Sequence, residues 1–110
     1  MRGMTCEDNP SRLTWEVQLY EPYSRVWISR GYGRATTTAQ PADIARAVLA
    51  GHLATTPARP GETFRALAYT DAAQPVFVTA DQLAEDAWEA GPAVRQALPA
   101  HLRDALSAAG

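Results

Sequence analysis

The residue types that most often perform chemistry are few in this chain and widely spaced. His52 and His101 are the only histidines. Neither has a second ligand at suitable spacing on the same helix face, except that Asp104 follows His101 by three residues. Because a zinc site needs three or four ligands, two residues do not make one, and we predict no metal site. We expect His52 to be a hydrogen-bonded histidine of the core.

The serines and glycines form no motif for nucleophilic catalysis or nucleotide binding. None of the four serines lies in a Gly-x-Ser-x-Gly elbow. Gly31-Tyr32-Gly33 is not Gly-x-Gly-x-x-Gly, and threonines follow it instead of a helix start. An enzyme would need His52 or His101 as a base in a concave pocket, which remains the weakest hypothesis. We therefore predict a non-enzymatic protein with no catalytic residues, no cofactor and no small-molecule substrate.

A cluster of carboxylates lies on a predicted helix near the end of the chain. Its members are Glu85, Asp86 and Glu89. Glu85 and Glu89 are four residues apart, so they share a helix face and repel each other unless a partner neutralises them. The cluster is interpreted either as a solvated face or as an acidic docking face.

Aromatic and basic residues gather over positions 25–34, as Arg25, Trp27, Arg30, Tyr32 and Arg34. Trp, Tyr and Arg are enriched at protein interfaces, so we expect this patch to bind a protein partner or a second copy, most simply in a homodimer. Sheets also hold single-stranded nucleic acid by stacking bases on aromatic rings, which is the alternative function. A pI of about 5.6 argues against a dedicated nucleic-acid module. In a purely structural interpretation, Trp27 packs under the last helices, and the arginines are solvated or pair with Glu16, Glu62 or the acidic helix.

The elements that carry this patch follow from the hydrophobic pattern. Odd positions over residues 13–19 are apolar and even positions are polar, which predicts a strand with one buried face. Pro22 predicts a turn, and residues 26–30 predict a second strand that completes a hairpin. We expect a bend or bulge at Gly31-Tyr32-Gly33 and a short third strand over residues 34–38.

The rest of the chain alternates helices and strands. A helix is predicted over residues 41–53, a central strand over 63–70 and another strand over 75–78. Thr79-Ala-Asp-Gln82 fits a capping box, and the last helical segment is interrupted or restarted at Pro99. The predicted fold class is α+β, a small, mostly antiparallel sheet covered by helices in the order β-β-(β)-α-β-β-α-α.

Length and composition limit the organisation of the chain. With 110 residues we expect a flexible segment over 1–11 and one domain over 12–110. The lone Cys6 and the lack of a long apolar run favour a reducing cytoplasm. Residues 22–70 hold six arginines and two carboxylates, a net charge of +4, whereas residues 71–110 hold two arginines and six carboxylates, a net charge of −4. Such a chain can bind an anionic partner or complement its own charge.

One stretch carries a resemblance to a known family. Residues 36–53, Thr-Thr-Thr-Ala-Gln-Pro-Ala-Asp-Ile-Ala-Arg-Ala-Val-Leu-Ala-Gly-His-Leu, follow a hairpin in an order of elements that is similar to HicB-type antitoxins. The similarity extends over about residues 14–70. The chain departs from that family by lacking a Pro-Gly-Cys-like element before the helix and by its acidic helical tail. The resemblance implies an antitoxin-like regulator that binds nucleic acid.

Overall fold

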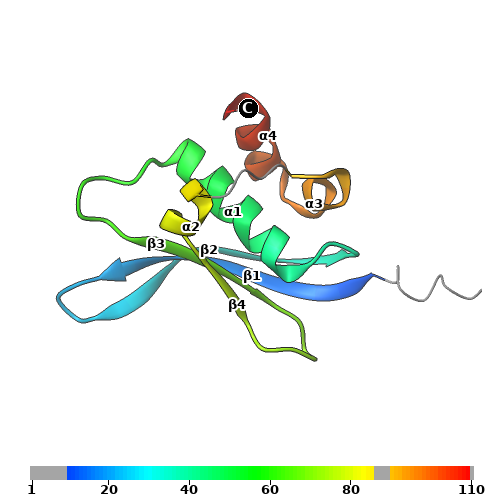
Figure 1. Cartoon of the computed structure of the whole chain (residues 1–110), viewed down its shortest axis with the longest axis horizontal. Helices are drawn as coiled ribbons and strands as arrows, with labels where there is room; N and C mark the ends of the chain where they lie inside the picture. Colours follow the sequence, from blue (N-terminus) through cyan, green and yellow to red (C-terminus); the bar gives the residue numbers. More distant parts are fainter. Residues whose placement is uncertain (1–9, 86–89, 110) are drawn as a thin grey trace, which may run out of the picture.

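The computed structural model describes residues 10–85 and 90–109. Its described part contains one four-stranded antiparallel sheet with four helices on one side, which confirms the predicted α+β fold (Figure 1). The elements are β1 (Ser11–Glu21), β2 (Val26–Thr37), α1 (Pro41–Thr55), β3 (Phe64–Tyr69), β4 (Val76–Thr79), α2 (Ala80–Glu85), α3 (Pro92–Ala97) and α4 (Ala100–Ala109). In the sheet the strand order is β2-β1-β3-β4.

The predicted hairpin is β1 and β2, and it contains a bulge. Val17 pairs with Gly31 but the next residue, Gln18, pairs with Ser29, so Arg30 is the extra residue in β2. The bulge lies next to the glycines that predicted it. The ladder then continues, and for this reason the expected third strand at residues 34–38 is the end of β2 instead of a separate element.

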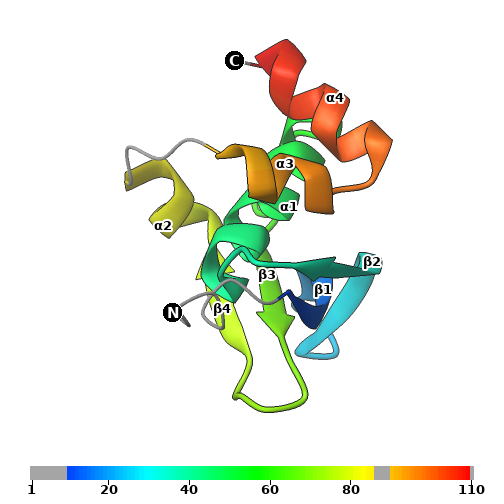
Figure 2. The same cartoon turned by 90° about the vertical axis from the view of Figure 1, so that its right-hand side faces the viewer.

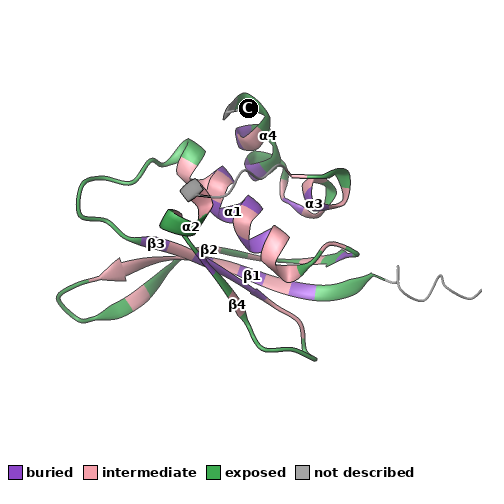
Figure 3. Ribbon diagram, in the orientation of Figure 1, coloured by how far each residue is buried: buried purple, intermediate pink, exposed green. Residues whose placement is uncertain are grey.

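The core forms where the sheet meets α1. Alternate residues of β1 and β3 point to the same side, and the apolar face of α1 covers them (Figure 3). β3 is a central strand, as its apolar residues on both faces predicted. The main buried side chains are Leu13, Trp15 and Val17 of β1, Ile44, Val48 and Leu49 of α1, Phe64 of β3 and Val78 of β4.

The helices cover the sheet in two steps, with α1 directly on the strands and two further helices on α1. α1 packs on β1, β3 and β4, while α3 and α4 lie against α1 (Figure 2). The predicted capping box begins α2, because the N–H of Gln82 donates to Thr79 Oγ1 at 3.2 Å and the N–H of Thr79 donates to Gln82 Oε1 at 2.9 Å. Leu98 and Pro99 separate α3 from α4, so the predicted restart is confirmed.

One end of the sheet lies outside this packing. The hairpin between β1 and β2 extends beyond the helices (Figure 1), so that Val26 and Ile28 are 48% and 43% exposed although they belong to the helix side of the sheet. β1 begins at Ser11, the last residue of the segment expected to be flexible.

Candidate functional site: the open face of the sheet

The side of the sheet away from α1 is called the open face here, because all described helices lie on the other side (Figure 2). Its residues alternate with the core residues along each strand. Five of them are aromatic, namely Tyr20, Trp27, Tyr32, Tyr69 and Phe77. A surface with this much aromatic side chain is typical of a recognition site.

Arg65 of β3 occupies the centre of the open face. Its guanidinium carbon lies 4.0 Å from the ring centroid of Trp27 and 4.6 Å from that of Phe77. Arg65 Nε also donates to Gln18 Oε1 at 2.7 Å, and Gln18 Nε2 donates to Glu16 Oε1 at 3.2 Å. We call Trp27, Arg65 and Phe77 the arginine stack. Because each planar group holds the next, this row of side chains is ordered before any partner arrives.

The environment of the stack affects its charge only slightly. Burial lowers the pKa of Arg65, and the nearby Glu16 carboxylate opposes that shift. A guanidinium titrates so far above neutral pH that Arg65 stays cationic. Tyr20 extends the stack, with its ring centroid 5.2 Å from that of Trp27 and the two planes inclined at 59°. The result is a cation framed by aromatic rings on an otherwise uncovered sheet.

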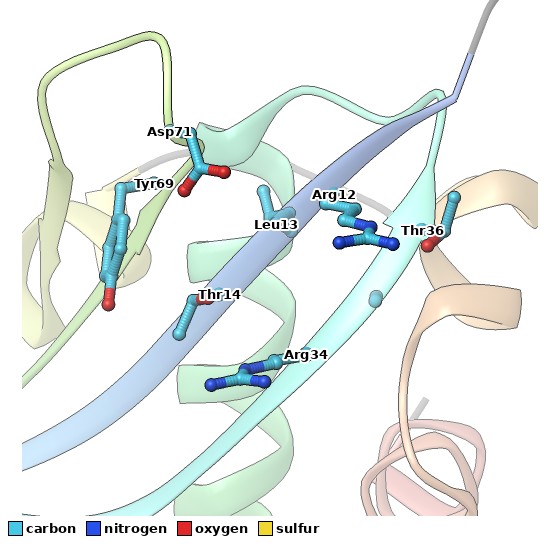
Figure 4. A pocket seen from close by; sticks show the side chains of 8 residues that line it. Arg12, Leu13, Thr14, Arg34, Thr36, Tyr69 and Asp71 are labelled. Carbon is cyan, nitrogen blue, oxygen red and sulfur yellow. The ribbon is translucent and has the colours of Figure 1, made fainter.

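A polar hollow lies at the other end of the open face. It has a volume of about 680 Å³, and its lining includes Arg12, Thr14, Arg34, Tyr69 and Asp71 (Figure 4). Among the residues that the structure describes, neither Arg12 nor Arg34 forms an ion pair. Two guanidinium groups on adjacent strands, neither paired with a carboxylate of residues 10–85 or 90–109, are suited to hold an anionic group.

The structure divides the predicted patch into three locations. Trp27, Tyr32 and Arg34 lie on the open face. Arg25 ends the hairpin turn with a φ of 60°, and it is exposed there. Arg30 is the bulged residue and is exposed, and its charge lowers the pKa of His52 of α1. The alternative packing of Trp27 under the last helices is wrong, since Trp27 contacts Tyr20 and Arg65.

Sequence reasoning missed Arg65, Phe77 and Tyr20. A signal for Arg65 was present, because Arg65, Leu67 and Tyr69 alternate with three core residues of β3. The predicted acidic docking face is only partly covered by the structure. Asp86 and Glu89 lie outside the described residues, and Glu85 is the last residue of α2.

His52 differs from its prediction. Its ring lies 5.4 Å from that of Phe64, but its Nε2 is buried without a hydrogen-bond partner, so the expected hydrogen bond is wrong for that atom. Burial, Arg30 and His101 together lower its pKa. In residues 10–85 and 90–109 no three potential ligands gather at a point that could hold a metal ion.

No known protein family, curated protein or solved structure matches this chain. No helix in the described part of the chain combines the length and the apolar character needed to cross a membrane. Function therefore has to be inferred from the residues of the open face.

Proposed function

We propose that this protein is a non-enzymatic interaction domain of the cytoplasm that forms a homodimer through the open face of its sheet. The observation that carries the proposal is the arginine stack. Trp, Arg and aromatic side chains held in place by one another are the kind of anchor that contributes most to protein–protein affinity. Their order in the free chain lowers the entropy lost on association.

The area of the face can be compared with that of a typical interface. The four strands have 11, 12, 6 and 4 residues, so at roughly 3.3 Å per residue and about 4.8 Å between strands the flat area of the face is about 500 Å². Each partner of a stable complex buries roughly 800 Å², so a dimer through this face also needs the relief of its aromatic side chains and the flanking loops.

Charge on the open face also favours a second copy. Glu16 lies on the same face as Arg12 and Arg34, so the surface carries both signs. A two-fold axis brings the same patch of both subunits together, which allows the carboxylate of one to meet a guanidinium of the other. The acidic residues Glu85, Asp86 and Glu89 remain a second predicted contact for a basic partner surface.

The test is the molar mass of the native protein by size-exclusion chromatography with light scattering. We expect a dimer, which Trp27→Ala dissociates without changing the circular dichroism spectrum. Arg103→Ala, at an exposed position on α4, is the matched control and should remain dimeric. A wild-type chain that elutes as a monomer at high concentration, with no protein partner recovered in a pull-down, contradicts the proposal.

A second candidate function is binding of single-stranded nucleic acid, favoured by the polar hollow with Arg12 and Arg34 beside Tyr69. It is placed second because Arg65 already contacts the rings of Trp27 and Phe77, which leaves less ring surface for bases. Absorbance at 260 nm in the same chromatography, on protein purified without nuclease, tests it. Excess absorbance that salt removes would favour nucleic acid. No binding to an oligonucleotide pool at low salt would exclude it.

A further inference from the structure

The outer edge of β2 pairs with no other described element. The strand order is β2-β1-β3-β4, so β2 is an edge strand. Within residues 10–85 and 90–109, the backbone of residues 31–36 forms hydrogen bonds with no element except β1. Such an edge is a template for one more strand. We propose that this edge binds an extended peptide of alternating acidic and apolar residues, independently of the interaction at the open face.

The two edges of the sheet differ in how well they suit an added strand. β4 has only four residues and Pro75 directly precedes it, and both features protect an edge from pairing. β2 has 12 residues and no proline, and its ladder is regular from Gly31 to Thr37, beyond the bulge at Arg30. This regular stretch has the length of an ordinary strand, so β2 is the edge that a peptide can extend.

A hollow beside the same edge offers room for the apolar side chains of the peptide. It lies between β2 and the connection from α3 to α4 (Figure 2), and its volume is about 410 Å³. Gly31 and Gly33 line it from the strand, and Ala97, Leu98 and Pro99 line it from the helices. A Cβ added at Gly31 meets no described atom within 4 Å, so β2 itself does not fill this space. Every second side chain of an added strand points to the helix side, where an apolar one can pack against Leu98 and Pro99.

The charge of β2 determines which side chains suit the other face of an added strand. Arg30 and Arg34 are exposed on β2, and Arg25 is exposed in the turn before it. The sequence has no carboxylate between Glu21 and Asp43. Acidic side chains on the open-face side of a peptide can therefore pair with Arg34 across the new ladder. A second copy of β2 is disfavoured as the added strand, because it brings further arginines and no carboxylate.

The proposal is tested with the end-blocked peptide Val-Glu-Val-Glu-Val-Glu-Val, added to ¹⁵N-labelled protein. We expect saturable shifts of the backbone N–H signals of residues 31–37, and slower hydrogen exchange at alternate positions among them. In an added strand either the valine or the glutamate nitrogens face β2, so methylation of one set should abolish binding and methylation of the other should not. Lysines in place of the glutamates should weaken binding, most strongly at low salt, and serines in place of the valines should also weaken it.

Substitutions in the protein locate the bound peptide. Arg34→Glu should weaken binding about fivefold, the effect of losing one exposed ion pair. Gly31→Leu should weaken it as well, because the new side chain enters the hollow that the valines would use. Arg59→Glu, in the exposed loop between α1 and β3, makes the same change of charge and should bind as the wild type does.

Three results would overturn the proposal. The first is a titration in which no signal of residues 31–37 shifts, or in which both methylated peptides bind as well as the unmodified one. The second is unchanged binding by both Arg34→Glu and Gly31→Leu. The third is protection of these N–H groups that is present without peptide and disappears on dilution, which would assign the edge to a second copy of the chain.

Discussion

Two glycines on the same side of β2 should respond in opposite directions to alanine. A Cβ at Gly33 would lie 2.6 Å from Cζ2 and 2.8 Å from Cε2 of Trp15, far inside van der Waals contact. Overpacking of a core costs about 1–3 kcal/mol. A Cβ at Gly31 meets no atom within 4 Å, and replacing a glycine inside a strand stabilises by about 0.5–1 kcal/mol. Because both variants gain this stabilisation, Gly33→Ala should be about 1–3 kcal/mol less stable than Gly31→Ala, the cost of overpacking alone.

Urea denaturation followed by circular dichroism measures this difference. In thermal denaturation, at about 4 °C per kcal/mol for a domain of this size, the two melting temperatures should differ by about 4–12 °C. Trp15→Phe removes the atoms that a Cβ at Gly33 would meet. In that background Gly33→Ala should cost less, and the double-mutant cycle gives the coupling between the two positions. A Gly33→Ala variant as stable as the wild type would refute the packing of Trp15 on β2.

Three further substitutions test other parts of the structure. Arg65→Met keeps an apolar stem but loses two cation–π contacts of about 0.5–1 kcal/mol each. Urea denaturation should therefore show a free energy of unfolding that is lower by about 1–2 kcal/mol. The same substitution should lower it by less in a Trp27→Ala background, where one of the two contacts is already absent. Thr79→Ala removes the oxygen that accepts from the N–H of Gln82 and should cost about 1 kcal/mol in the same assay; an unchanged midpoint would contradict this cap. The pKa of His52 is lowered below 6.5 in the folded chain, so the unfolded chain binds the proton at higher pH, and stability is full above pH 6.5 and falls below it. His52→Gln should flatten the fall in the free energy of unfolding between about pH 7.5 and 5.5, and an unchanged slope would contradict the shift.

The fold could be predicted from the sequence because its signals are local. The alternation of residues 13–19, the proline at the start of α1 and the box from Thr79 to Gln82 each depend on neighbours a few residues away. The candidate site could be predicted only in part, because it depends on which strands are adjacent. Arg65 reaches Trp27 across β1, the strand between them, and its Nε–H donates to Gln18 of that strand. The sequence of β3 alone does not indicate that Trp27 lies next to Arg65.

The bulge at Arg30 explains why a contiguous patch in the sequence became two different surfaces. In a regular strand, odd and even residues lie on opposite faces, so Trp27 and Arg34 would be separated. The extra residue shifts the alternation by one position, which places both on the open face and leaves Arg30 without a partner in the ladder. The same alternation places Gly31 and Gly33 on the helix side, where the indole of Trp15 occupies the position of a Gly33 side chain. One inserted residue thus lets β2 present an aromatic, basic surface on the open face while Gly33 makes room for the core indole of Trp15 on the other side.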